Sequence, residues 1–187
     1  MMWSPVKALI QSYTRTKLNN HSEFREMMDI RTNSSNNTVY ADADGTIAYY
    51  HGDFIPKRNV KFDFTKPVDG SDPETDWKGL HEVDEIITIV NPSNGWIQNC
   101  NSTPFTAAAE NSPKPSDYPR YMSLNRENLR GVHAIRLLKN MESMTIDKLI
   151  DMAYDPYLPA MEMTIPTLVT AYNQSPSKDS KLSLIHI

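Results

Sequence analysis

The stretch Asn91–Pro104, which reads NPSNGWIQNCNSTP, holds more information about fold and function than any other part of the sequence. It opens with two turn signals, Asn-Pro and Asn-Gly, because Asn and Gly tolerate the positive φ of tight turns. Trp96-Ile97 then predicts a short strand, which would place Asn99 and Asn101 on one face at its end. A carboxamide fixed there can donate a hydrogen bond to a developing oxyanion, although such asparagines are more often turn or capping residues.

Size and composition limit the classes of protein to consider. The chain has 187 residues with 39% hydrophobic content, enough for one domain with a core. Its 19 basic and 23 acidic residues are mixed, so no basic stripe points to nucleic acid. No apolar run reaches the roughly 18 residues of a membrane span. The single Cys100 excludes an internal disulfide.

Hydrophobic periodicity predicts helices on both sides of a β-hairpin. A helical pattern covers residues 6–30 with a break near Asn19-Asn20, and its methionines are expected in the core. Further helices are expected at 128–140, from Thr145 to 153, and after Pro166. The hairpin joins Thr38–Asp42 to Thr46–His51 through an Asp-Gly turn. These elements predict an α+β fold.

The remaining segments are expected to be irregular. Residues 52–80 are proline-bearing and aperiodic, which predicts a long functional or edge-covering loop, and 81–90 reads as a short connector. His51 is interpreted as structural, as a lone histidine at a strand end usually is. We expect one partial domain over residues 1–174, followed by a disordered or non-native tail at 175–187.

Five motifs in order resemble the penicillin acylase family of N-terminal-nucleophile hydrolases, which includes the acyl-homoserine-lactone acylases. The motifs span roughly residues 30 to 155, and together they are specific where each alone would be weak. They are YADADGTIAY at 40–49, DWKGL at 76–80, NPSNG at 91–95, NCN at 99–101 and RGVHAIRLL at 130–138. The resemblance implies an αββα sandwich, present here in part, with antiparallel hairpins and flanking helices.

The resemblance also implies a chemistry and assigns roles to two residues. In the family, an N-terminal serine freed by self-cleavage attacks an amide carbonyl, with its own α-amine as the base. Asn101 falls on the asparagine of the oxyanion hole, and Arg130 on the arginine that orients this asparagine near the nucleophile's amine. No residue of this chain fits the nucleophile, since Ser4 lacks the family's context. We therefore expect an interior fragment of the larger, β chain of a zymogen, inactive on its own.

Partners, cofactors and location follow from the same resemblance. The expected partners are the missing parts of the precursor, namely the small α chain and the nucleophile-bearing start of the β chain. The expected substrate is an N-acyl small molecule, an acyl-homoserine lactone or a penicillin-type amide of the kind met in antibiotic biosynthesis. Catalysis needs no cofactor. A structural calcium is possible near Asp63 or Phe64 and Asp117, without a firm ligand assignment. The family is periplasmic or secreted, although no signal peptide is visible here.

Two other interpretations stay open. In the first, the chain is a non-catalytic acylase-like scaffold in which Asn101 and Arg130 are structural. In the second, it is a carbohydrate-binding β domain that uses Trp77, Trp96 and Tyr49 as stacking platforms. The second interpretation predicts a line of exposed aromatic side chains.

Overall fold

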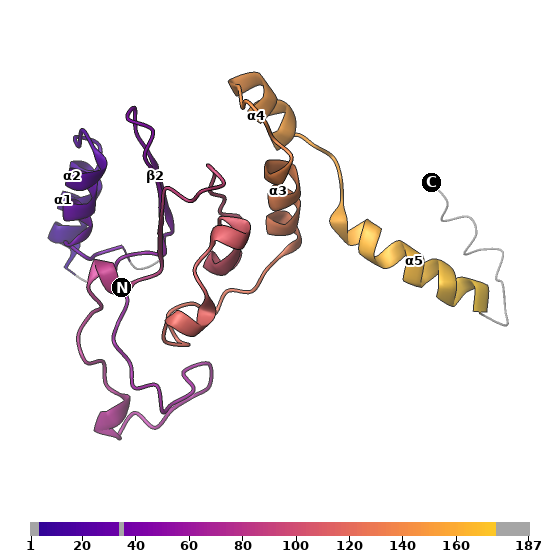
Figure 1. The fold of residues 1–187 in the computed structure, drawn as a ribbon. Helices are drawn as coiled ribbons and strands as arrows, with labels where there is room; N and C mark the ends of the chain where they lie inside the picture. Colours follow the sequence, from indigo (N-terminus) through magenta and orange to yellow (C-terminus); the bar gives the residue numbers. More distant parts are fainter. Residues whose placement is uncertain (1–3, 34–35, 175–187) are drawn as a thin grey trace. The chain divides into compact units, whose positions relative to one another are not determined.

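The chain forms helices and a small antiparallel sheet, which confirms the predicted α+β class (Figure 1). The structure is a computed structural model that describes residues 4–33 and 36–174. Its contacts divide the chain into two compact units, Met1–Leu138 and Lys139–Ile187. The first unit contains the sheet and both residues to which the sequence assigns catalytic roles.

Two helices open the first unit, with the predicted break between them. Helix α1 spans Pro5–Thr14 and begins with proline, whose missing N–H costs nothing at a helix start. Helix α2 spans His21–Met28, and the side chain of Asn20 caps it by accepting a hydrogen bond from the Glu23 N–H at 2.9 Å. The apolar stripe of α1, Val6, Leu9, Ile10 and Tyr13, is exposed in this chain.

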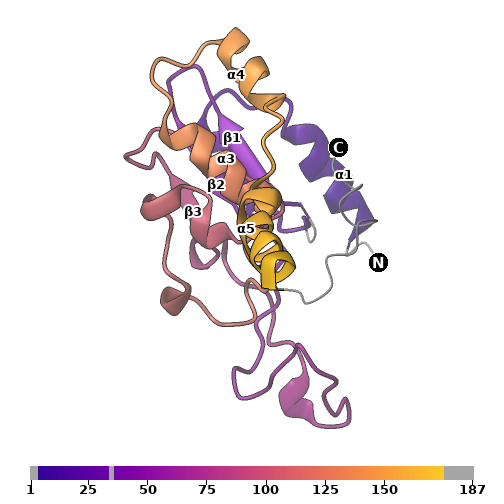
Figure 2. The same cartoon turned by 90° about the vertical axis from the view of Figure 1, so that its right-hand side faces the viewer.

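The sheet has three antiparallel strands in the order β1-β2-β3, which Figure 2 shows side by side. The predicted hairpin is confirmed as β1, Thr38–Ala41, and β2, Ile47–Tyr50, with Gly45 at a φ of 86° in the turn. Strand β3, Thr88–Val90, lies within residues 81–90, which were predicted to be only a short connector. It pairs with β2 so that Tyr49 lies opposite Ile89.

The predicted strand at Trp96-Ile97 is wrong, because this segment follows the sheet without joining it. The segment at 104–111 that lies beside it forms 3₁₀ turns, Pro104–Thr106 and Ala109–Asn111, and therefore offers no extended partner. The hydrogen bond from the Gln98 N–H to the Ala107 carbonyl, 2.8 Å long, links the two segments. Asn99 and Asn101 accordingly do not share a strand face.

Each face of the sheet has its own core, as the alternation of side chains along a strand dictates. Ala48 and Tyr50 pack with α2 on one face, and Tyr49 packs with Ile89 on the other. The first core also includes Phe24, Met27, Met28, Val83, Ile86, Ile87 and Met122, so the methionines are core residues as predicted. The second core includes Ala107 and Ala108. In Figure 1, α1 and α2 lie to one side of β2, and the 104–111 segment lies to the other.

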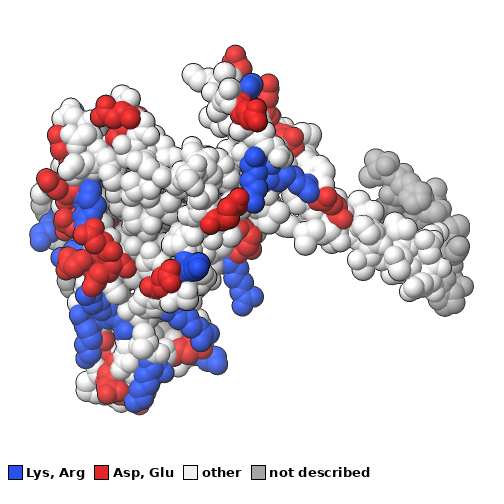
Figure 3. All heavy atoms as spheres, in the orientation of Figure 1, with Lys and Arg blue, Asp and Glu red and all other residues white. Residues whose placement is uncertain are grey.

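The long loop at 52–80 is confirmed as a loop, and hydrogen bonds close its base. The Lys57 N–H donates to the Gly79 carbonyl, and the Lys78 N–H donates to the Lys57 carbonyl, both at 2.9 Å. Inside the loop, the Arg58 guanidinium lies over the rings of Phe64 and Trp77. Basic and acidic side chains are interspersed over this loop and the neighbouring helices (Figure 3). Short 3₁₀ turns occur at Pro73–Thr75, Val83–Glu85 and Pro115–Asp117.

Helix α3, Leu129–Lys139, occupies the predicted position at the end of the first unit. In the second unit, α4, Ile146–Ala153, begins as predicted with the Thr145 hydroxyl capping the Lys148 N–H. The predicted start of the last helix at Pro166 is wrong, because α5 spans Pro159–Gln174 and contains Pro166 inside it. Pro159 supplies the favourable first position instead. The predicted tail at 175–187 lies outside the described residues, and no described helix is long and apolar enough to cross a membrane.

Met28 is fully buried between α2 and the sheet. We predict that Met28→Ala lowers the free energy of unfolding by about 2–5 kcal/mol, because the cavity removes packing contacts as well as apolar burial. Urea unfolding followed by circular dichroism measures this change. The matched control is Met163→Ala on α5, where Met163 is 66% exposed, and its effect should stay within about 0.5 kcal/mol. Equal effects of the two substitutions would contradict the placement of Met28 in the core.

Candidate functional site

Asn101 has a backbone conformation that few non-glycine residues adopt. Its φ is 55°, in the left-handed region that Asn tolerates better than other non-glycine residues. Its side chain is exposed, while the next residue, Ser102, is 1% exposed and anchors the segment. Left-handed residues concentrate at functional sites, where the surrounding structure must hold them in place. The sequence alone predicted a strand here and so missed this turn.

The side chain of Asn128 fixes the start of α3 against the Asn101 segment. Its amide nitrogen donates to the Cys100 carbonyl at 3.0 Å, and its side-chain oxygen accepts from the Gly131 N–H at 3.0 Å. One side chain therefore caps the helix and ties it to the residue before Asn101. The sequence signal for this role, an Asn directly before a helical pattern, was available but was not interpreted as part of the site.

Gly131 lets α3 approach the Asn101 segment closely. A Cβ added at this buried glycine would lie 2.9 Å from the Ser102 Oγ and 3.0 Å from its Cβ. It would also lie 2.3 Å from the side chain of Glu127. A Cβ at position 131 does not fit unless these neighbouring side chains move, so this close contact requires glycine.

The consequence of this approach is a direct contact between the two predicted site residues. Arg130 Nη2 donates a hydrogen bond to Asn101 Oδ1 at 3.2 Å. The guanidinium has only donors, so it selects the oxygen end of the carboxamide. The amide nitrogen of Asn101, with its two N–H groups, is then turned away from Arg130. The structure brings the pair together, and their catalytic roles stay predictions.

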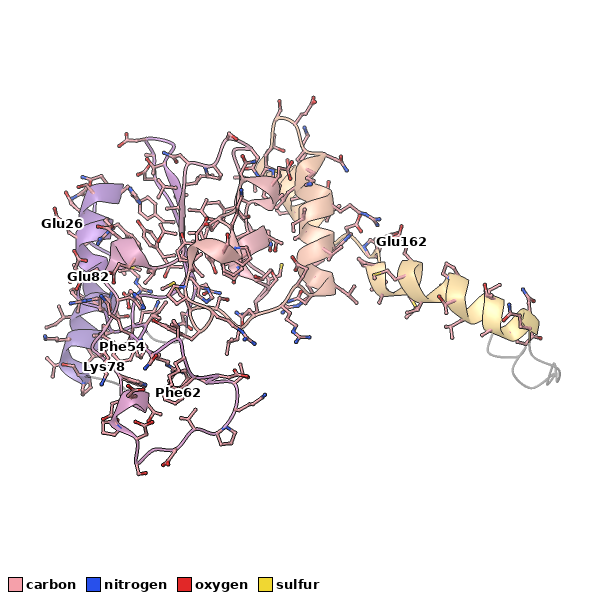
Figure 4. All side chains as sticks on the ribbon, turned by 60° about the horizontal axis from the view of Figure 1, so that its bottom comes forward. Glu26, Phe54, Phe62, Lys78, Glu82 and Glu162 are labelled. Carbon is pink, nitrogen blue, oxygen red and sulfur yellow. The ribbon has the colours of Figure 1, made fainter. Side chains whose placement is uncertain are left out.

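A cleft of about 260 Å³ adjoins Asn101. It is lined by residues from the loop before β1, the loop after β2 and the segment before α3. They are Asn36, Asn37, His51, Gly52, Phe54, Ile55, Asn101, Met122 and Asn125. Phe54, which Figure 4 labels, contributes an aromatic wall to it. Apart from Asn101, none of these residues was assigned to a site from the sequence.

His51 lies beside the buried hydroxyl of its neighbour Tyr49. Tyr49 is fully buried, and burial raises the pKa of its hydroxyl, which therefore stays protonated. The Tyr49 hydroxyl lies 3.0 Å from His51 Nδ1. Burial also lowers the pKa of His51, which favours the uncharged ring. The protonated Tyr49 hydroxyl can donate to Nδ1 when the proton of His51 lies on Nε2, or accept from Nδ1–H in the other tautomer.

The two loops that wall the cleft are joined by the buried carboxylate of Asp53. Its Oδ1 accepts from the Asn33 N–H at 2.6 Å, and its Oδ2 accepts from the side chain of Gln11 on α1. In return, the Asp53 and Phe54 N–H groups donate to the Asn33 carbonyl, both at 3.1 Å. Burial raises the pKa of Asp53 to about 6, although the bonds from Gln11 and Asn33 oppose the rise.

The residues considered for calcium do not assemble into a site in this chain. The Asp63 carboxylate accepts hydrogen bonds from the Thr65 N–H at 3.1 Å and the Thr65 hydroxyl at 2.6 Å. Asp117 lies in the separate 3₁₀ turn at 115–117. Within residues 4–33 and 36–174, no three His, Cys, Asp or Glu side chains are placed to hold a metal ion. Calcium binding by the family pattern stays a prediction without assigned ligands.

The remaining residues considered from the sequence have ordinary surroundings. Ser4 immediately precedes α1 and its side chain makes no capping bond to that helix. Cys100 is half-buried, and burial raises the pKa of its thiol. Tyr49 is fully buried, so the line of exposed aromatics that a carbohydrate-binding domain requires is not formed with Trp77 and Trp96.

Comparisons with known proteins agree on one family. A model of that family, penicillin amidase, matches residues 2–186. Penicillin G acylase of Escherichia coli is 38% identical over 68 residues, which make up 36% of this chain and 8% of that protein. The structure of thermostable penicillin G acylase from Alcaligenes faecalis has a similar fold, with a TM-score of 0.67 and 22% identity. That match covers 94% of this chain and 30% of the other. The chain thus spans under a third of these relatives.

Gly131→Ala tests the close approach of α3. Alanine favours a helix by about 1 kcal/mol over glycine, but the added methyl group overlaps Ser102, and such overpacking costs about 1–3 kcal/mol. We predict a net loss of up to about 2 kcal/mol in the free energy of unfolding. The control is Gly70→Ala, where a Cβ meets nothing within 4 Å. A stabilised Gly131→Ala protein would contradict the predicted clash.

Asp53 predicts a pH dependence of stability. Its pKa is raised from 3.8 in the unfolded chain to about 6 in the folded one, so folding favours the neutral form. The resulting contribution is complete below pH 3.8 and is lost as the pH rises through about 6. The loss reaches at most about 3 kcal/mol, at 1.4 kcal/mol per pKa unit. Asp53→Asn cannot titrate, so wild-type stability should fall relative to this variant between pH 4 and 7. A difference in unfolding free energy between wild type and Asp53→Asn that stays constant over this pH range would contradict the prediction.

Proposed function

The chain belongs to the penicillin amidase family, and we propose that it carries the oxyanion side of the active site of an amide hydrolase. The family match over residues 2–186 supports amide hydrolysis at the family level. We further propose that the three-stranded sheet is part of a larger αββα sandwich, completed by segments beyond this chain. The similarity in fold to a penicillin G acylase supports this part of the proposal.

The observation that carries the proposal is the hydrogen bond from Arg130 to Asn101. An oxyanion hole needs N–H groups that already point to where negative charge develops, so that nothing reorganises during the reaction. The bond at 3.2 Å holds the oxygen of the Asn101 carboxamide, which leaves its N–H groups for a ligand. The side chain of Asn101 is exposed beside a cleft, so a substrate can reach it.

The proposed mechanism assigns a role to each of the two residues. A serine Oγ at the N-terminus of the processed larger chain attacks the carbonyl carbon of an N-acyl amine, and its proton passes through water to the α-amine. The carbonyl oxygen becomes an oxyanion, which accepts a hydrogen bond from Asn101 Nδ2. The charge of Arg130 disfavours protonation of a nearby α-amine and so keeps that amine available as a base. The tetrahedral intermediate then collapses, the amine leaves with a proton, and water hydrolyses the acyl-serine.

The proposed partners are the other parts of the same precursor. A small α chain and the nucleophile-bearing start of the β chain would supply the groups that Asn101 and Arg130 serve. The exposed apolar stripe of α1 supports this, because Val6, Leu9 and Ile10 are each more than half exposed and such stripes are normally covered. By the same family argument, the protein acts in the periplasm or outside the cell. The chain alone is expected to be inactive.

The test is to express the full-length protein that contains this chain and to sequence the N-terminus of its larger subunit. A subunit that begins with serine after an internal cut supports the proposal. We then predict that Asn101→Ala lowers kcat for an N-acyl amide about 10²- to 10³-fold while the subunits remain assembled, because one oxyanion donor is lost. The control is Asn59→Ala in the long loop, which should retain wild-type turnover. An uncut protein without a terminal nucleophile would instead indicate a non-catalytic scaffold.

Arg130 provides a second test of the same geometry. We predict that Arg130→Ala lowers kcat by a factor comparable to that of Asn101→Ala, and that the double variant is hardly worse than either single one. The reason is that the two side chains act as one unit, so their effects are not additive. Arg130→Lys retains the charge but not the planar donor geometry, and should restore turnover only in part. Fully additive effects would contradict a shared role.

A further inference from the structure

The cleft beside Asn101 is lined mainly by uncharged polar residues, together with Phe54, Ile55 and Met122, and this property narrows the class of substrate. Four asparagines, Asn36, Asn37, Asn101 and Asn125, line it together with His51. No Lys, Arg, Asp or Glu is among its lining residues. A charged group inside it would therefore lack a counter-ion in the lining itself, and Arg130, which adjoins the lining, already donates to Asn101 Oδ1 at 3.2 Å. A plain alkyl group would remove the carboxamides from water and offer them no replacement bond, at about 1–3 kcal/mol for each group left unsatisfied.

His51 gives the cleft a hydrogen-bonding ring that its neighbour Tyr49 holds in place. The Nδ1 of His51 lies 3.0 Å from the buried Tyr49 hydroxyl, and with that hydroxyl as the donor the ring proton lies on Nε2. Tyr49 packs with Ile89 and the alanines of the second core, so it holds the ring against a rigid support. A neutral imidazole in one tautomer can donate through Nε2 to a carbonyl or hydroxyl oxygen but cannot neutralise an anion.

The walls of the cleft are connected before any ligand binds. Asn33 Nδ2 donates to the Asn36 carbonyl at 2.7 Å, and its Oδ1 accepts from the Asn36 N–H at 3.2 Å. The Asn33 carbonyl meanwhile accepts from the N–H groups of Asp53 and Phe54. One residue thus sets the position of the Asn36 wall relative to the wall that carries His51. Preorganisation of this kind lowers the entropy lost when a ligand binds.

We propose that this cleft recognises an uncharged, hydrogen-bonding substituent of the substrate, such as a hydroxyl, keto or carboxamide group, and that His51 determines this specificity. The inference rests on the proposed function, since Asn101 joins the cleft to the scissile carbonyl. It adds that the preferred N-acyl amine is polar near the scissile bond. His51 binds the substituent through Nε2–H, and the asparagines satisfy the remaining donors and acceptors.

The experiment uses the processed full-length protein and pairs of N-acyl amides that differ only in a hydroxyl in place of a methyl group. One pair carries the change on the acyl side, and a second pair carries it on the amine side. For one of these pairs, kcat/KM should favour the hydroxyl compound about tenfold, the contribution of one neutral hydrogen bond. The preference should appear mainly in KM, because the cleft binds the substituent and not the reacting atoms.

Three variants identify the residues responsible. His51→Phe removes the donor and should reduce the hydroxyl preference to about one, whereas His51→Gln retains a neutral donor and should restore part of it. Asn36→Leu, at an exposed position in the cleft wall, tests the lining without disturbing Tyr49 and remains informative if His51→Phe fails to fold. The matched control is Asn59→Leu outside the cleft, which should leave the preference unchanged.

The outcomes separate the two proposals. Hydrolysis of both pairs without a hydroxyl preference, or with a preference that survives His51→Phe and Asn36→Leu, overturns the specificity while leaving the hydrolase intact. A preference for a charged or an all-alkyl substituent over the hydroxyl also overturns it. No hydrolysis of any N-acyl amide by a correctly processed protein overturns the proposed function, and the specificity with it.

Discussion

The arrangement of three segments in the first unit depends on the buried carboxylate of Asp53. It accepts hydrogen bonds from Gln11 on α1 and from the backbone of Asn33, and thereby connects the first helix to the loops on both sides of the hairpin. A carboxylate removed from water is costly unless donors surround it. The chain provides those donors only when the three segments have reached their native positions. The hydrogen bonds of Asp53 therefore specify one arrangement among the many that apolar packing alone would allow.

A second constraint is the absence of a side chain at Gly131. It allows α3 to lie close to the segment that contains Asn101 and Ser102. The helix lies so close to Ser102 that its first turn delivers Arg130 to Asn101. Asn128 then holds this position, because its side chain donates to the Cys100 carbonyl and accepts from the Gly131 N–H. The candidate oxyanion donor is therefore built from a helix start and an irregular turn, each rigid because it is attached to the other.

Local signals in the sequence were sufficient for much of the fold. The break before α2, the Asp-Gly hairpin and the start of α4 at Thr145 all depend on residues within a few positions of one another, and each was predicted. The failures involve distant partners. Whether Trp96-Ile97 becomes a strand depends on the shape of the segment at 104–111, and β3 was missed because only its pairing with β2 makes it a strand. The contact of Asn101 with Arg130 followed from family resemblance, whereas the Asn36–His51 cleft arises from loop packing that no local pattern encodes.

The left-handed backbone at Asn101 also restricts how this position can evolve. Glycine accepts the φ of 55° but has no carboxamide, and glutamine retains the carboxamide but tolerates the conformation poorly. Aspartate tolerates the backbone and would pair with Arg130, yet as an ionised group it has no N–H to donate. Each of these three replacements thus satisfies one requirement and loses another. Among these residues, asparagine alone combines a backbone that accepts the turn with a neutral N–H donor, so a site that needs both is restricted in the substitutions it can accept.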